Sequence, residues 1–284
     1  MGLYDRDYTN DNFRARFRNA PQMRMSFPSI TPMVKRLLII NVAVFLVAII
    51  IKPLGVFIYN WFQLDATTPL RALQFWRLVT YQFLHDPSSI FHIFFNMLGL
   101  FFLGPTLEHH WGSRRFLFFY LYCGATGALF YLLLVAVKFL PAIPMVGASG
   151  AILGMLAACA ILFPHFVVFI FLFPVPIRVA AVAFTAIYFV AVLTKDSNAG
   201  GDAAHLAGMA AGAFYVFSQR WRAKLKLKLM SNQWRKEMVS QHDLQVELDN
   251  ILQKVHGSGV HSLTKKEKKT LRQATKAQQM RNEL

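Results

Sequence analysis

The sequence predicts an all-α fold, a polytopic membrane bundle of six transmembrane helices. Of the 284 residues, 55% are hydrophobic and only 15% are charged, a balance typical of a helical bundle solvated by lipid. In addition, six apolar runs approach the roughly 20 residues that a helix needs to cross a bilayer. These runs lie near residues 35–53, 89–107, 115–139, 147–164, 177–194 and 202–218.

The distribution of basic residues predicts how the bundle is oriented. The formal net charge is +16, and the Lys and Arg residues lie mostly at the two ends of the chain and in the short connections. Six spans put both termini on one side. The positive-inside rule makes that side cytoplasmic, because the Arg-rich head, Arg114, Arg115 and the tail from Arg220 onward fall there. This placement favours anionic lipid headgroups, and not nucleic acid, as the partner of the basic tail.

Three segments lie outside the predicted spans. The Arg-rich head, residues 1–34, is longer than the charged region of a cleavable signal peptide, so we expect the first span to stay in the mature protein. The connection over 54–88 is expected to fold into the membrane interface, because its amphipathic aromatic residues prefer the headgroup zone. These residues are Trp61, Phe62, Trp76 and Phe83.

The apolar stretch 166–178 is short and contains Pro174 and Pro176. We expect an interfacial connection there, since a seventh span would place the basic tail outside.

The tail after the sixth span predicts a small cytosolic helical hairpin. Apolar residues recur there at helical spacing, at Leu244, Leu248, Ile251, Leu252 and Val255. Two glycines, Gly257 and Gly259, interrupt this run, and Thr264 with Glu267 matches a capping box that opens a Lys-rich helix. The chain therefore divides into a basic head (1–34), a six-span domain (35–218) and a basic helical tail (219–284).

Hydrogen-bonding side chains inside the spans are the functional candidates, because lipid makes such residues expensive. They are His92 and Asn96 in the second span, Ser149 in the fourth and His205 in the sixth. With the N-terminus inside, the even-numbered spans all begin at the outer face, so His92, Ser149 and His205 share one shallow depth. Both cysteines, Cys123 and Cys159, lie inside apolar runs, so we expect them to be small packing residues. Two cysteines so placed indicate neither a disulfide framework nor a metal site.

The candidate residues fit acyl transfer by a serine. A serine hydroxyl becomes a nucleophile when a neutral imidazole takes its proton, and His205 is the candidate base for Ser149. Ser149 lies at a helix N-terminus, so its backbone N–H can bind an oxyanion, and the side chains of His92 and Asn96 can add two more donors. Small residues on the fourth and sixth spans let the two backbones approach. They are Gly147, Gly150, Gly208 and Gly212.

Each candidate also has a simpler structural interpretation. A serine among small residues is most often a helix-packing site, and a lone membrane histidine is more often a satisfied hydrogen-bonding residue than a base. The predicted common depth of the candidates favours catalysis over these interpretations. Asp202 could be a third member of a triad, but its place at a helix start favours an N-cap.

These residues resemble the motifs of the rhomboid family of intramembrane serine proteases. Gly147-Ala148-Ser149-Gly150 resembles the GxSG motif of the nucleophile, and Ala204-His205 with Gly208 and Gly212 resembles the AHxxGxxxG motif of the base. His92 with Asn96 is similar to the HxxxN oxyanion motif. Further similarities are Trp76-Arg77 to the family's WR dipeptide and Glu108 through Trp111-Gly112 to the turn after its second span. The resemblance covers residues 35–218, and the tail around Ser262 is similar to an extension on many bacterial members.

The resemblance implies a serine protease without metal or cofactor that has a Ser149–His205 dyad and is located in a bacterial inner membrane. Its substrates would be single-span or multi-span membrane proteins, which enter beside span five and are cut near their outer end. One residue departs from the pattern: many members carry an aromatic residue four positions after the serine, where this chain has Leu153.

Two other functions remain open. A non-catalytic rhomboid-like protein would bind membrane helices without cutting them. A transporter would place charged residues near the membrane midplane and show repeated halves, whereas the candidates here cluster near one face.

Overall fold

The computed structural model describes residues 29–170 and 173–282. The predicted basic head therefore lies outside the described residues except for 29–34. The chain forms two compact units, which divide between Val216 and Phe217. Each unit has its own packing and is described by itself.

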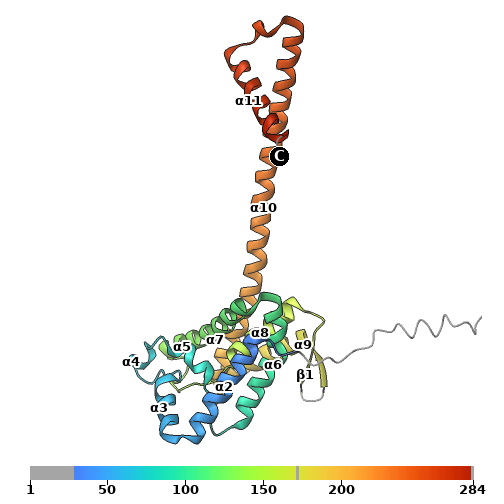
Figure 1. The fold of residues 1–284 in the computed structure, drawn as a ribbon. Helices are drawn as coiled ribbons and strands as arrows, with labels where there is room; N and C mark the ends of the chain where they lie inside the picture. The colour runs from blue at the N-terminus through green and yellow to red at the C-terminus, as the bar shows by residue number, and fades with distance from the viewer. Residues whose placement is uncertain (1–28, 171–172, 283–284) are drawn as a thin grey trace, which may run out of the picture. The chain divides into compact units, whose positions relative to one another are not determined.

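The first unit is a bundle of apolar helices (Figure 1). Among the described residues, four helices are long and apolar enough to cross a membrane: α2 (Pro32–Ile50), α6 (Ile90–Trp111), α7 (Ser113–Ala136) and α9 (Ile177–Thr194). A fifth apolar helix, α8 (Ser149–Leu162), has only 14 residues. The helical membrane bundle is confirmed, while the count of six spans stays a prediction.

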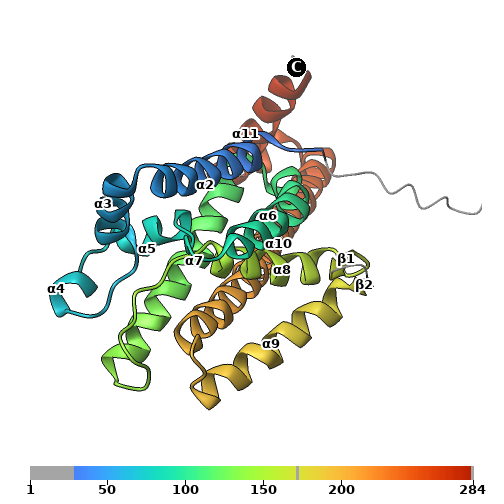
Figure 2. The same cartoon turned by 90° about the horizontal axis from the view of Figure 1, so that it is seen from below.

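Helix α8 lies in the middle of the first unit, packed against α6, α7 and α9 (Figure 2). Every residue from Gly150 to Ala160 is buried. A Cβ atom on Gly208 or Gly212 would overlap the carbonyl oxygen of Gly150 or Gly154, respectively. The glycines thus allow the close approach of α8 and α10 that the sequence predicted.

The sixth predicted helix has different bounds. The sequence predicts a span over 202–218, but α10 (Ala199–Ser258) begins three residues earlier and continues to Ser258. The basic residues that follow Arg220 mark the end of the apolar run without ending the helix, because Lys and Arg have high helix propensity.

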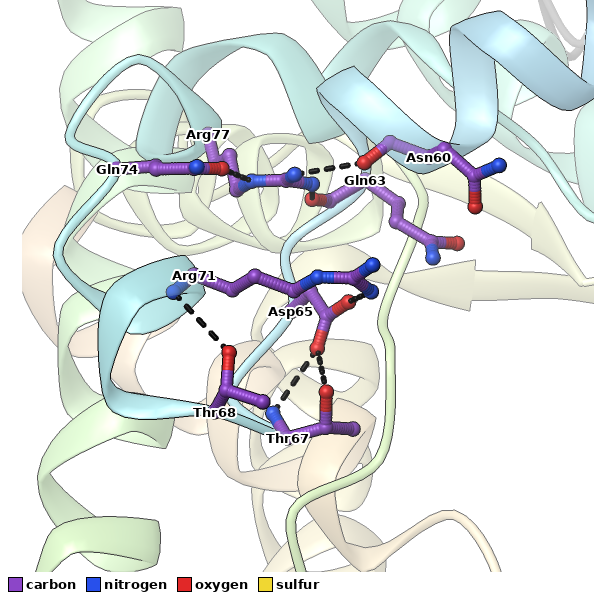
Figure 3. A network of polar contacts seen from close by, with 8 residues as sticks. All are labelled: Asn60, Gln63, Asp65, Thr67, Thr68, Arg71, Gln74 and Arg77. Carbon is purple, nitrogen blue, oxygen red and sulfur yellow. Dashed lines mark hydrogen bonds and ion pairs between the residues drawn. The ribbon is translucent and has the colours of Figure 1, made fainter.

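The connection between α2 and α6 folds into α3 (Lys52–Phe62), α4 (Pro69–Ala72), α5 (Arg77–Thr80) and the 3-10 turn η1 (Tyr81–Phe83). Two polar centres hold it together (Figure 3). The buried carboxylate of Asp65 accepts hydrogen bonds from the backbone N–H of Thr67 at 2.9 Å, from its hydroxyl at 2.6 Å and from Arg71 at 2.5 Å. The guanidinium of Arg77 donates to the carbonyl oxygens of Asn60 and Gln63.

Residues 167–170 and 173–176 pair as the two strands of a β-hairpin, in a stretch where the sequence predicted only an interfacial connection. Strands β1 (Val167–Ile170) and β2 (Phe173–Pro176) pair antiparallel, with Val168 opposite Val175. Val168 packs against the core, while Val167 and Phe169 are exposed. The two prolines argue against a paired strand in the sequence, but a strand accepts proline where the backbone nitrogen needs no hydrogen-bond partner.

The second unit contains the rest of α10, the 3-10 turn η2 (Val260–Ser262) and α11 (Lys265–Asn282), which folds back along the end of α10 (Figure 1). The predicted capping box is confirmed: the Thr264 backbone N–H donates to Glu267 at 2.6 Å, and the Glu267 backbone N–H donates to the Thr264 hydroxyl at 3.3 Å. Lys254 forms an ion pair with Glu267 at 3.0 Å. Ile251 and Leu263 are buried in this unit.

Candidate active site

The structure brings Ser149 and His205 into direct contact. The Ser149 Oγ atom lies 2.6 Å from His205 Nε2, although 56 residues separate the two along the chain. Ser149 is the first residue of α8, and His205 lies in the second turn of α10. A serine hydroxyl at this distance from an imidazole nitrogen can lose its proton to that nitrogen.

The chain enters α8 through an unusual backbone conformation at Gly147. Its φ angle of +131° is one that residues with a side chain rarely adopt, and its N–H donates to the Tyr81 carbonyl at 3.0 Å. A Cβ atom there would also lie 2.8 Å from His92 Nε2. Glycine is therefore needed at this position for both conformation and space.

A cavity of about 320 Å³ lies over the two side chains. Of the predicted site residues, it is lined by Ser149, His205, His92, Gly147 and Gly150. Its polar lining also includes residues that the sequence analysis did not select: Asp86, Ser89 and Asn198. Gly208 and Gly212 pack α10 against α8 outside this lining.

Trp76 and Arg77 also lie outside the lining of the cavity. The Trp76 indole donates to the Trp61 carbonyl at 3.0 Å, and Arg77 holds the connection between α2 and α6. The positions of both residues indicate a structural role.

The two predicted side-chain donors on α6 have different surroundings. His92 lines the cavity, with its Nε2 close to Gly147. Asn96 is buried, and its amide donates to the His92 carbonyl at 2.7 Å. An amide nitrogen carries two hydrogens, so Asn96 keeps one more to donate. The first backbone N–H groups of α8, beginning at Ser149, have no partner within the helix and can bind an anion.

The structure corrects the role predicted for Asp202. The residue is not an N-cap, because α10 begins at Ala199 and Asp202 lies inside its first turn. Its Oδ1 atom accepts a hydrogen bond from the Asn198 side chain at 3.3 Å and lies 3.4 Å from His205 Nδ1. That second contact lacks hydrogen-bond geometry, and His205 Nδ1 has no hydrogen-bond partner among the described residues.

Two aromatic side chains near the site were missed by the sequence analysis. Tyr188 of α9 packs on His205, with ring centroids 4.6 Å apart and an interplanar angle of 60°. His85 is fully buried and lies 5.3 Å from His92 in an edge-to-face contact. Burial, together with the neighbouring His92, lowers the pKa of His85 to about 3, so its imidazole is neutral at physiological pH. A polar aromatic residue inside a span was the available signal for Tyr188.

Within residues 29–170 and 173–282, no three His, Cys, Asp or Glu side chains are grouped so that they could hold a metal ion. The chemistry that the site can perform is proton transfer between Ser149 and His205 beside a set of hydrogen-bond donors.

Two family models match parts of the chain. The model of the Rhomboid domain matches residues 72–222 of this chain. A family of unknown function (DUF6576) matches residues 239–277, within the second unit.

Several curated proteins are similar to parts of the chain, among them the following three. "Rhomboid protease GluP" of Bacillus subtilis is 42% identical over 85 residues, which are 30% of this chain and 15% of that protein. "Rhomboid protein 1, mitochondrial" of Saccharomyces cerevisiae is 34% identical over 138 residues, or 45% of this chain and 38% of that protein. "Inactive RHOMBOID-like protein 8" of Arabidopsis thaliana is 34% identical over 85 residues, or 30% of this chain and 22% of that protein. The chain thus spans well under half the length of each of these relatives.

Proposed function

The chain belongs to the rhomboid family of integral membrane proteins, and from this premise we propose that it is an intramembrane serine endopeptidase. Its substrates are membrane proteins with one or several spans, and it cuts their transmembrane helices near the outer membrane face. The observation that carries the proposal is the 2.6 Å contact between Ser149 Oγ and His205 Nε2 beside a polar cavity.

The proposed reaction proceeds in two steps. His205 Nε2 takes the proton of Ser149 Oγ while that oxygen attacks the carbonyl carbon of the scissile bond. The negative charge on the carbonyl oxygen is stabilised by the Ser149 backbone N–H and by the side chains of His92 and Asn96. His205 then gives the proton to the leaving amine, and a water molecule activated by His205 hydrolyses the acyl enzyme. The proposed reaction includes no metal and no cofactor.

The runner-up is a non-catalytic member of the family that binds membrane helices. One similar protein carries the word inactive in its name. The presence of both Ser149 and His205, and the contact between them, supports the protease over this alternative.

For location, we propose a bacterial inner membrane with both termini in the cytoplasm. The basic residues at the two ends and in the Arg114–Arg115 turn support this orientation. The basic tail would then contact anionic headgroups of the inner leaflet.

The test is cleavage of a generic transmembrane substrate by the purified protein in detergent. Ser149→Ala and His205→Ala should each abolish cleavage, by about a thousand-fold or more, because each removes a reacting group. Both variants should keep the thermal unfolding temperature of the wild type. A fluorophosphonate probe should label the wild type in a manner that depends on His205.

Exposed residues of the same types supply matched controls. Ser197 and His109 are both exposed, so Ser197→Ala and His109→Ala should cut at the wild-type rate. Substantial cleavage by purified Ser149→Ala would reject the mechanism.

A further inference from the structure

The imidazole of His205 lacks the support that a catalytic base usually has. A base of this kind is normally held by a hydrogen bond from its second ring nitrogen, which fixes its tautomer and orientation. Here His205 Nδ1 is buried with no hydrogen-bond partner among the described residues, and the nearest carboxylate oxygen, of Asp202, lies 3.4 Å away in poor alignment. The orientation of the ring must therefore come largely from packing.

The packing contact on this ring comes from α9. The Tyr188 ring lies against the imidazole at 4.6 Å between centroids, and the Phe184 ring stacks on Tyr188 at 5.9 Å with an interplanar angle of 13°. Phe184 and Tyr188 are four residues apart, so they share one face of α9. Both are partly buried, while their neighbours Ile187 and Phe189 are exposed. The aromatic face of α9 is thus the face turned toward the dyad.

The helix that carries this face is lightly packed. Only 17% of the residues of α9 are buried, and the helix contacts α8 and the β-hairpin. A further contact places the Thr185 hydroxyl 3.7 Å from the Met209 sulfur on α10. Phe184 and Tyr188 also pack against the buried core of the first unit, so a readout at His205 itself is needed to separate positioning from core packing.

We propose that Tyr188 is a positioning residue for His205. Its ring, backed by Phe184, holds the imidazole so that Nε2 stays within reach of Ser149 Oγ. Leu153, one helical turn after Ser149, is aliphatic, so α9 supplies the aromatic support that α8 does not. The inference rests on the proposed protease function for its kinetic measurement, but the ring contact itself can be measured without catalysis.

The kinetic test compares Tyr188→Ala, Tyr188→Leu and Tyr188→Phe in the purified full-length protein. Loss of the ring should lower kcat by about ten- to a hundred-fold, since a small misplacement of a catalytic group has effects of this size. KM for a transmembrane substrate and the unfolding temperature should remain close to the wild-type values. Tyr188→Phe should keep kcat within about threefold, because the ring and not the hydroxyl makes the contact. Phe118→Ala, the loss of an exposed ring on α7, away from span five, is the matched control and should cut normally.

A second measurement tests the contact directly. In protein labelled with ¹³C at the histidine Cε1 position, the His205 signal is assigned by its absence in His205→Gln. The ring current of Tyr188 should make this signal shift in Tyr188→Ala and remain nearly in place in Tyr188→Phe.

The proposal is overturned if Tyr188→Ala keeps kcat within about twofold of the wild type, or if its activity falls only as the folded fraction falls. It is equally overturned if Tyr188→Phe is as slow as Tyr188→Ala, or if the His205 signal does not move in Tyr188→Ala. If the wild type cuts no substrate and binds no fluorophosphonate, the proposed protease function fails, and the His205 signal alone then decides whether Tyr188 holds the ring.

Discussion

His92 and Asn96 share one face of α6, but only His92 lines the cavity beside Ser149. His92→Ala and Asn96→Ala should each lower turnover by roughly ten- to a thousand-fold, since one lost oxyanion donor costs a few kcal/mol while the dyad survives. We expect the larger loss for His92→Ala, because Asn96 already spends one hydrogen on the His92 carbonyl. The double variant should lose less than the sum of the two single effects. Steady-state turnover is measured on preparations of known folded fraction.

Asn41 supplies the matched control for this series. It is buried in α2, and its amide donates to the carbonyl of Leu37, four residues earlier, at 2.7 Å, the same local contact that Asn96 makes. Asn41→Ala should lower the unfolding temperature and leave turnover per folded molecule unchanged. If Asn96→Ala behaves in the same way, Asn96 is a packing residue and not an oxyanion donor.

The connection between α2 and α6 depends on the buried carboxylate of Asp65. Burial would raise the pKa of Asp65, but hydrogen bonds from Thr67 and the charge of Arg71 more than offset this and hold it below its ordinary value. The Asp65 carboxylate therefore contributes its full stabilisation of the folded state above the ordinary pKa of an aspartate, about 3.9. This stabilisation is lost as the pH falls through the lowered pKa that Asp65 has in the folded state. Asp65→Asn should cost about 1–3 kcal/mol near neutral pH.

Thermal unfolding in detergent across a pH series measures this effect. The gap in unfolding temperature between the wild type and Asp65→Asn should begin to shrink below about pH 4, where the carboxyl of the unfolded chain takes up a proton, and should be smallest once the pH lies below the lowered pKa of the folded state. Asp196→Asn, in an exposed connection, should change stability by less than about 0.5 kcal/mol. A gap that stays constant down to pH 2 would show that the charge of Asp65 contributes nothing.

At the scale of the whole molecule, the proposed orientation can be tested by cysteine labelling. The two native cysteines, Cys123 and Cys159, are buried, so the wild type should react little with a maleimide that cannot cross membranes. Ser197→Cys, in the exposed connection between α9 and α10, should be labelled from outside intact cells. Ser240→Cys, exposed in the second unit, should be labelled only after the membrane is opened.

Labelling of the wild type measures the background reaction of the two native cysteines. Labelling of both variants after detergent treatment shows that each introduced thiol is reactive. Labelling of Ser240→Cys in intact cells, with Ser197→Cys protected, would mean that the molecule is inserted in the opposite orientation.

The sequence by itself determined the helical membrane class, the approximate places of the apolar helices and the candidate dyad. Each of these follows from the local cost of placing a residue in lipid, which composition and spacing reveal. The Ser149–His205 pair could be predicted because a polar side chain in an apolar span has few possible hydrogen-bond partners, and these two lie at a similar predicted depth.

Only the tertiary structure decided how the dyad is supported. Tyr188 reaches His205 across 17 positions of the chain, Asp202 lies inside a helix that begins earlier than predicted, and the prolines of β2 are accepted in a paired hairpin. These features depend on which helices pack together and where each one begins. Such contacts between distant segments leave no local signal in a single sequence. The cost of placing a polar side chain in lipid does leave one, because it shapes the composition of each apolar run.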